Sequence, residues 1–146
     1  MANSLIRGMI AKGAEKTSIL AADLDSAKLS KLRSECGIET ASSAEIAKTA
    51  DIIVLAVKPQ AMKLVCAELK RLLGERSPLI ISIAAGITTS HLGRWLAKNT
   101  AIVRCMPNTP ALVGKGASGL YANEHANQVH RDLAQKVMSS VGICVW

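Results

Sequence analysis

The sequence predicts an α/β fold, in which helices wrap a doubly wound parallel sheet. Segments with apolar residues at three- and four-residue spacing, typical of amphipathic helices, alternate with short apolar runs rich in β-branched residues. Strands and helices that alternate in this way form parallel strands joined by right-handed crossovers. The 146 residues, 49% of them hydrophobic, suffice for one domain with a core and are too few for two. We therefore expect a single domain over residues 1–146.

The amino-terminal part is expected to form a helix and then a short strand. The helix has one apolar stripe and stops at Gly13. The residues of that stripe are Leu5, Ile6, Met9 and Ile10. A strand over residues 19–22 follows and ends at Asp23.

Two more helices are expected before the middle of the chain. Ser26 is the expected cap of the first of them, which ends near Gly37, because glycine is common just beyond a helix C-terminus. Ser42 and Glu45 have the spacing of a capping box, in which the side chain of each residue accepts a hydrogen bond from the backbone N–H of the other. A short helix is therefore expected to begin there.

Two apolar runs in the middle of the chain predict strands buried on both faces. Residues 51–57 and 79–83 show no polar alternation, which is typical of a parallel sheet. Between them, Pro59 opens a helix that ends at Gly74. Its apolar face carries Met62, Val65, Leu69 and Leu72.

The last third continues the alternation. A helix around Leu92 and Leu96 precedes a strand over residues 101–104 and a turn-rich stretch over residues 106–110. A strand is expected at residues 118–122, then a helix, and another strand begins at residues 143–146. The apolar face of that helix carries Val129, Leu133 and Val137.

This order of elements also predicts where a ligand binds. In open α/β sheets the ligand lies beyond the carboxyl ends of the strands. Three segments occupy such ends, namely residues 57–59, 84–86 and 105–110. We expect the binding edge to be formed there.

Both ends of the chain look cut. Because the order begins with a helix, a doubly wound sheet would lack its first strand, and no G-x-G-x-x-G motif occurs anywhere. The strand at residues 143–146 has barely begun when the sequence stops. The expectation is a truncated domain.

Asp23 is the candidate for recognition of a nucleotide ribose. It ends a strand, at the place where dinucleotide-binding folds hold an acid that binds the ribose hydroxyls. An acid there repels a 2′-phosphate and so favours NADH over NADPH. A turn aspartate is the plainer interpretation, and Asp25 is a competing candidate.

Other polar or small residues stand at the expected binding edge, each with a plainer alternative. Lys58 follows a buried strand and is fixed by Pro59, but a solvated lysine is the commoner case there. Ala84 and Ala85 allow a ligand close to the backbone, or simply close packing of strand and helix. Asn108 lies in a rigid loop between two prolines, where asparagine also serves ordinary turn chemistry.

Several classes of function are disfavoured. The net charge is +7, but the basic residues are scattered, and the three aromatic residues are too few to stack bases, so no nucleic-acid partner is expected. The four cysteines form no C-x-x-C pair and have no nearby histidine, so no metal site is expected. Ser82 lacks a G-x-S-x-G context, and no histidine has a matched partner, so no catalytic residue is assigned. With neither a signal peptide nor an apolar span, the expectation is no membrane association and a cytoplasmic protein.

Three segments taken in order resemble pyrroline-5-carboxylate reductases. They are Asp51-Ile-Ile-Val-Leu-Ala-Val-Lys-Pro-Gln60, Ser82-Ile-Ala-Ala-Gly-Ile87 and Val103-Arg-Cys-Met-Pro-Asn-Thr-Pro-Ala-Leu-Val-Gly-Lys-Gly116. The third is the most specific, and the resemblance covers essentially the whole chain. It implies the amino-terminal Rossmann domain of an NAD(P)H-dependent oxidoreductase of proline biosynthesis. Enzymes of this family reduce the small molecule 1-pyrroline-5-carboxylate to L-proline.

The resemblance also implies cofactor contacts. The family's nicotinamide-proximal loop corresponds to residues 56–59 (Ala56, Val57, Lys58 and Pro59), and its second backbone contact to Ile83, Ala84 and Ala85. Asn108 lies in the loop beside the reacting ring. Met1 matches the end of the glycine motif at the pyrophosphate, Ser43 stands near the adenine ribose, and Asp23 stands where the family selects between NADH and NADPH, here favouring NADH.

The same resemblance implies that parts are missing. The family's first strand and glycine loop would precede Met1, and its helical carboxy-terminal domain, which forms the homo-oligomer and most of the substrate pocket, would follow Trp146. This chain alone is therefore expected to be inactive. The alternative is a non-catalytic, truncated Rossmann module that acts in protein interaction through an exposed sheet edge. Another dehydrogenase acting on 2-hydroxy or keto acids would not explain the M-P-N-T-P-A segment.

Overall fold

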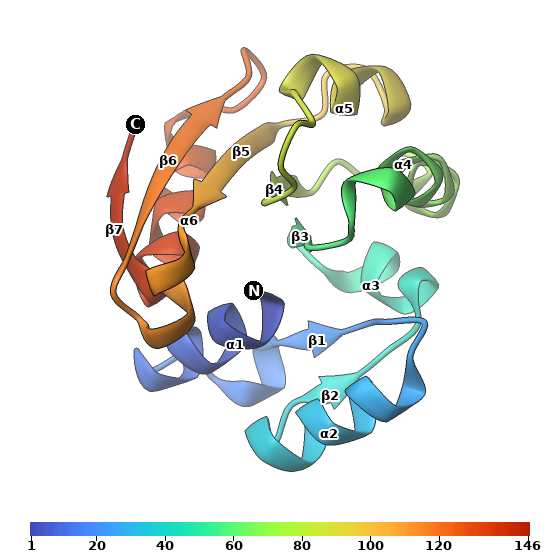
Figure 1. Ribbon diagram of the computed structural model, residues 1–146. Helices are drawn as coiled ribbons and strands as arrows, with labels where there is room; N and C mark the ends of the chain where they lie inside the picture. Colours follow the sequence, from blue (N-terminus) through green and yellow to red (C-terminus); the bar gives the residue numbers. More distant parts are fainter.

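Seven strands form two sheets in the computed structural model, which describes residues 1–146 (Figure 1). The larger sheet has the order β3-β4-β5-β6-β7, and the smaller one pairs β1 with β2. The strands are β1 (Leu20–Ala21), β2 (Glu39–Thr40), β3 (Ile52–Leu55), β4 (Leu79–Ser82), β5 (Ile102–Pro107), β6 (Gly116–Ala122) and β7 (Gly142–Val145). The α/β class expected from the sequence is confirmed.

Six α-helices and three short 3₁₀ helices connect the strands. The α-helices are α1 (Ala2–Ala11), α2 (Ser26–Cys36), α3 (Ser43–Thr49), α4 (Pro59–Leu73), α5 (Thr89–Trp95) and α6 (Gln128–Met138). The 3₁₀ helices are η1 (Lys16–Ser18), η2 (Thr109–Val113) and η3 (Ser139–Val141). Every helix expected from the sequence is present.

Most helix ends lie where the end signals predict them. Pro59 is the first residue of α4, and Gly37 ends α2 in the left-handed conformation, at φ 68°. The capping box at the start of α3 is formed, with the Ser42 hydroxyl accepting from the Glu45 N–H and the Glu45 carboxylate accepting from the Ser42 N–H. The expectation for Ser26 was wrong by one residue. Asp25 caps α2, because its carboxylate accepts hydrogen bonds from two first-turn N–H groups.

The larger sheet is parallel except at one pair of strands. β3, β4 and β5 run parallel. Leu55 pairs with Ser82, and Ser82 pairs with Arg104, at the carboxyl ends of β3 and β4. β6 runs antiparallel to β5, and β7 runs parallel to β6. The β5–β6 connection is too short for the crossover helix that a parallel pair requires, so the chain reverses there.

Two further details differ from the expectations. The strand expected at residues 101–104 extends through Pro107, because Met106 and Pro107 pair with Gly119 and Ser118 instead of forming a turn. The second is β2, a two-residue strand that no apolar run predicts and that exists through its pairing with β1.

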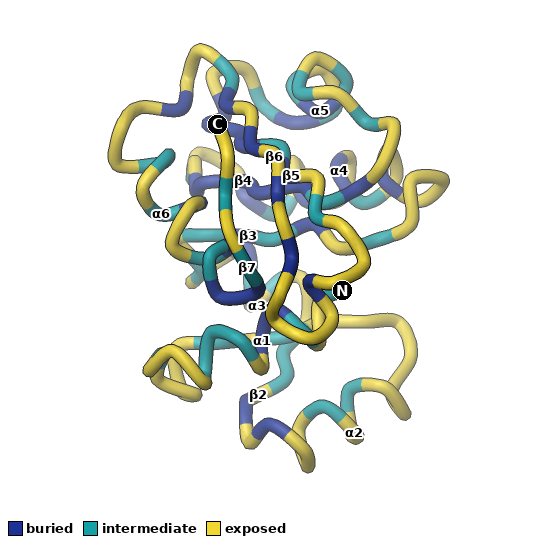
Figure 2. Tube along the Cα trace, turned by 60° about the vertical axis from the view of Figure 1, so that its left-hand side comes forward, coloured by how far each residue is buried: buried dark blue, intermediate teal, exposed yellow.

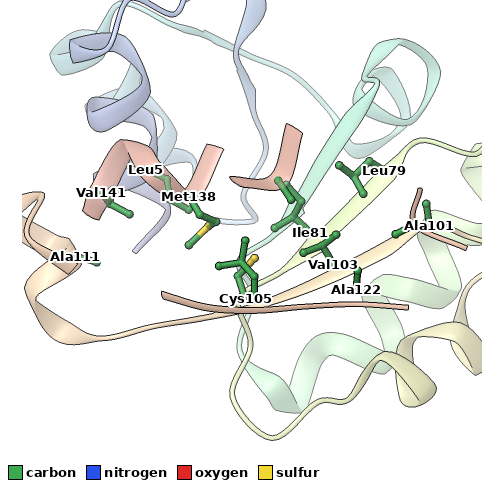
Figure 3. Close-up of a cluster of buried hydrophobic side chains, with 13 residues drawn as sticks. Leu5, Leu79, Ile81, Ala101, Val103, Cys105, Ala111, Ala122, Met138 and Val141 are labelled. Carbon is green, nitrogen blue, oxygen red and sulfur yellow. The ribbon is translucent and has the colours of Figure 1, made fainter. Parts of the chain in front are cut away.

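The core lies on both faces of the larger sheet. One cluster joins Ile81, Val103 and Cys105 to Leu5 of α1 and Met138 of α6 (Figure 3). A second cluster, on the opposite face, joins the sheet to α4 and α5. Figure 2 shows buried residues concentrated along β3, β4 and β5, and mostly exposed residues on α2.

Helix α1 links the two sheets. Leu5 belongs to the core of the larger sheet, whereas its neighbour Ile6 packs with Cys36 and Ile38 beside the smaller sheet. Gly8 of α1 lies so close to η3 that a Cβ there would overlap the carbonyl oxygen of Ser140. The smaller sheet is therefore positioned mainly through this helix.

Candidate functional site

The residues expected at the binding edge follow the carboxyl ends of five strands. Because β3, β4 and β5 are parallel neighbours, the segments that follow them, residues 56–59, 83–85 and 108, lie at one edge of the larger sheet. β1 and β2 are also parallel, so Asp23 and Ser43 lie at one edge of the smaller sheet. Met1 stands directly before α1.

Lys58 connects β3 to α4. It is the N-cap residue of α4, with extended backbone at φ −61° and ψ 144°, and its side chain makes no capping hydrogen bond. The side chain is exposed and forms no ion pair, whereas Val57 packs against the α4–α5 core. Partly buried Val57 and the ring of Pro59 thus hold the Lys58 backbone and the free N–H groups of the first α4 turn at the edge.

The turn after β4 presents small residues. Ala84 is buried and its N–H donates to the Ser82 hydroxyl, at 3.4 Å, while Ala85 is exposed. Gly86 adopts φ 74°, which permits the tight turn. Ser82, wholly buried, is a hydrogen-bonded core residue, as expected, and Ala85 leaves backbone accessible to a ligand.

Asn108 has a structural role. Its side-chain oxygen accepts a hydrogen bond from the Ala117 N–H, at 2.9 Å, one step beyond the Pro107–Ser118 pair. The side chain thereby extends the β5–β6 ladder across the loop. Its amide NH₂ donates no hydrogen bond within the protein and remains available at the exposed edge.

The two acids after β1 are used differently. Asp25 is committed to capping α2. Asp23 accepts one hydrogen bond, from the Asp25 N–H at 2.9 Å, and its second oxygen has no partner. Ser43, the first residue of α3, is exposed and makes no side-chain hydrogen bond. Asp23, of the two candidates, therefore keeps the free acceptor that a ribose hydroxyl requires.

The start of α1 lies close to the loop after Asn108. A pocket of about 270 Å³ is lined by α1, η2 and η3, including Ser4, Gly8, Ala111 and Ser140. The α1 N-cap residue, Met1, provides no side-chain cap, so the first-turn N–H groups are free. Free amides at a helix N-terminus are groups that bind phosphates.

Histidines and cysteines play local roles. His91 and His130 each sit in the first turn of a helix, where Nδ1 accepts from the N-cap N–H. Burial raises the pKa of the Cys66 thiol to about 11 and, with Cys144 nearby, that of Cys105 to about 12. No group of three or more potential metal ligands forms, and no helix has the length and apolar character needed to span a membrane.

Another pocket lies on the β5–β6–β7 face and was not anticipated from the sequence. It has a volume of about 380 Å³. Its lining comprises Arg104, Met106, Gly119, Leu120, Tyr121, Val145 and Trp146. Only the strand pairings bring these residues together, so no local sequence signal marks the pocket.

Comparison with known proteins identifies the family to which the chain belongs. The family described as NADP oxidoreductase, coenzyme F420-dependent, matches residues 1–86. Pyrroline-5-carboxylate reductase of Pseudomonas aeruginosa is 46% identical over 147 residues, which cover 100% of this chain and 54% of that protein. The enzyme of Vibrio alginolyticus is 38% identical with the same coverage. The chain thus spans about half the length of the curated relatives it matches.

Solved structures give the same result. A pyrroline-5-carboxylate reductase from Coxiella burnetii is 41% identical with a TM-score of 0.95, covering 99% of this chain and 54% of that one. The Plasmodium falciparum enzyme, solved with NADP bound, is 26% identical with a TM-score of 0.78, covering 97% and 52%. The resemblance drawn from the three sequence segments is confirmed. This chain belongs to the NADP oxidoreductase, coenzyme F420-dependent, family and is homologous to the amino-terminal NAD(P)-binding domain of pyrroline-5-carboxylate reductases.

Proposed function

We propose that this chain is the nicotinamide-dinucleotide half of a cytoplasmic, homo-oligomeric enzyme that reduces 1-pyrroline-5-carboxylate to L-proline. The observation that carries the proposal is the clustering of Lys58, Ala85 and Asn108 at one carboxyl edge in a chain that matches such reductases over its whole length. A bound NADH or NADPH supplies the hydride that reduces the imine carbon.

Each edge residue has a positioning role in this proposal. Lys58 offers its ammonium, on a backbone held by Pro59, to a phosphate or to the nicotinamide carboxamide. Ala85 leaves room for the ring against the backbone, and the free Asn108 NH₂ donates to a group beside the ring. Fixing the donor ring against the imine carbon supplies much of the rate enhancement, because hydride transfer depends on close approach.

We further propose that the cofactor is NADH. The free oxygen of Asp23 accepts a ribose hydroxyl and repels a 2′-phosphate. Ser43 lies at the same edge of the smaller sheet, beside the expected adenosine.

The test is a chimera in which residues 1–146 replace the 147 residues they match in the Pseudomonas aeruginosa relative. The purified chimera is supplied with NADH and either 1-pyrroline-5-carboxylate or a small keto acid, and absorbance of the reduced cofactor is followed. Loss of absorbance with the imine alone supports the proposal. A folded chimera that reduces only the keto acid, or neither compound, contradicts it.

An interaction module is the second candidate function. The exposed side chains of Ile143 and Val145 on the edge strand β7 favour it, because such an edge pairs readily with another chain. A chain that binds no dinucleotide but sediments as a complex with another protein would favour this second function.

A further inference from the structure

A group of polar side-chain contacts joins helix α1 to helix α2. The Arg7 guanidinium donates to the Glu35 carboxylate through Nη2, and its Nε donates to the Asn3 side-chain oxygen, at 3.0 Å. The Cys36 thiol donates to the same Asn3 oxygen, at 3.9 Å. We call these four residues, Asn3, Arg7, Glu35 and Cys36, the strap.

The strap joins two parts of the molecule that share little apolar contact. The clusters on the two faces of the larger sheet contain thirteen and twelve buried residues, whereas the cluster between α1 and the smaller sheet contains three, Ile6, Cys36 and Ile38. In Figure 1, α2 lies beyond β1 and β2, on the side away from the larger sheet. Because so small a core fixes a helix weakly, the polar contacts take a large share in orienting α2.

The strap leads from one half of the proposed cofactor site to the other. Asn3 lies in the first turn of α1, whose N–H groups have no side-chain cap. Glu35 and Cys36 end α2, and at the other end of that helix Asp25 is the cap and binds Asp23. Because a helix moves as a rigid element, a displacement at Glu35 is carried to the turn that holds Asp23.

Helix α1 is the fixed side of this connection. Leu5 lies in the core of the larger sheet, and Gly8 lies so close to Ser140 that no Cβ would fit between them. The larger sheet carries Lys58 at its carboxyl edge. The strap therefore ties the Asp23 half of the site to the half that contains Lys58.

The chemistry of the strap is that of an orienting contact. A guanidinium is planar and holds its donors in a fixed geometry, so partners on two different helices restrict how those helices lie. The side chains of Arg7 and Glu35 are 54% and 34% exposed, and an ion pair so exposed adds little to the free energy of unfolding. We therefore expect the strap to act on the geometry of the site more than on stability.

We propose that Arg7 is a positioning residue for a bound dinucleotide, because the strap fixes the distance between the two halves of its site. The inference rests on the proposed function, in which Asp23 and Lys58 bind opposite ends of one dinucleotide. Such a ligand is bivalent, and once one half is bound, the effective concentration of the other half falls if its site is displaced. A mononucleotide occupies one half alone, so its affinity does not depend on that distance.

The experiment measures the affinity of the chimera described above for NADH, AMP and reduced nicotinamide mononucleotide. NADH binding is followed by nicotinamide fluorescence, and the two mononucleotides are measured by their displacement of NADH. We expect Arg7→Gln to raise Kd for NADH roughly threefold, in keeping with an exposed ion pair, and to leave both mononucleotide constants unchanged. Glu35→Gln removes the other partner and is expected to give the same result.

Arg33→Gln is the matched control. Arg33 lies on the same helix and pairs with Glu39 at 3.5 Å, so its loss removes the same charge and one ion pair. That pair joins α2 to β2 and does not include α1. We expect Kd for NADH to be unchanged in this variant.

Reversing the pair separates the contact from the charges that form it. Arg7→Glu and Glu35→Arg each place like charges together and are expected to raise Kd for NADH. The double variant re-forms the pair with opposite polarity and should recover part of the loss, because the effects of contacting residues are coupled. Recovery is expected to be incomplete, since Lys31 lies 3.8 Å from the Glu35 carboxylate and would repel an arginine there.

Three results would overturn this inference while the proposed function stands. They are an unchanged Kd for NADH in both Arg7→Gln and Glu35→Gln, an equal loss of affinity for NADH and AMP, and simple addition of the two losses in the double variant. The second would confine the effect of Arg7 to the adenosine half. A folded parent chimera that binds none of the three nucleotides would instead contradict the proposed function, and this inference with it.

Discussion

Asp23 and Asp25 carry identical side chains and are separated by one residue, but they differ in what they can still bind. Asp25 is committed to capping α2, whereas Asp23 retains a free oxygen. In the chimera, Asp23→Ser is expected to raise the ratio of kcat/KM for NADPH to that for NADH about tenfold, since a repulsion of 1–2 kcal/mol is removed. Asp25→Ser keeps a good cap and should leave the ratio unchanged. A ratio that responds equally to both substitutions, or to neither, would remove Asp23 from the site.

Asn108 allows its structural and binding roles to be separated. Asn108→Ala removes the acceptor for the Ala117 N–H and is expected to cost about 1 kcal/mol in urea unfolding. Asn108→Asp keeps that acceptor but removes the free NH₂, so stability should be retained while KM for cofactor or substrate rises in the chimera. If Asn108→Asp kinetics match the parent chimera, the residue serves the β5–β6 loop alone.

The thiols provide a pH-dependent prediction. Burial raises the pKa of Cys66 to about 11 and that of Cys105 to about 12, from an unfolded value of 9.0. The folded state therefore holds more protons than the unfolded state above pH 9, so the free energy of unfolding falls as pH rises through that range. Below pH 9 the contribution of both thiols is complete. In Cys66→Ala, urea unfolding should show a shallower decline over the same range.

At the scale of elements, one glycine is required where η3 turns into β7. Gly142 adopts φ 152°, and a Cβ there would overlap the carbonyl oxygen of Gly116 across the β6–β7 pair. Gly142→Ala is expected to destabilise the chain by more than about 1 kcal/mol in urea unfolding. Gly93→Ala in α5 is the control, because its Cβ meets nothing and alanine favours a helix by about 0.5–1 kcal/mol. Equal effects of the two substitutions would contradict the β6–β7 geometry.

Element ends were predictable because their signals are local. Pro59, Gly37 and the Ser42–Glu45 box act within one helical turn, and the structure places each as expected. Ser26 was misassigned because Asp25 and Ser26 are both good caps, and only the backbone entering α2 decides between them.

Pairing partners were less predictable than element ends. β2 exists only through its contact with β1, and β6 reverses direction because the loop from Asn108 to Lys115 is short. The pairing of β2 depends on residues distant in sequence, which local periodicity does not report. The edge residues were nonetheless placed at strand ends correctly, because any parallel strand presents its carboxyl end to the same edge. The pocket on the β5–β6–β7 face, in contrast, required the register of three strands.

At the scale of the whole molecule, two sheets share one helix. α1 contributes Leu5 to the core of the larger sheet and Ile6 to the packing around the smaller one. The proposed adenosine residues Asp23 and Ser43 therefore keep their position relative to Lys58 and Asn108 largely through α1. Strain or loosening in that helix is expected to affect both ends of a bound dinucleotide together.

The claim that the strand ends form a dinucleotide site is tested most directly by NMR. The backbone amides of the chain, 15.4 kDa in mass, are assigned, and NADH is then titrated in. We expect the largest shift changes at Asp23, Lys58, Ala85 and Asn108, with the amides of β6 and β7 unmoved. Shift changes confined to β6 and β7, or no changes in a folded chain at saturating NADH, would contradict the account.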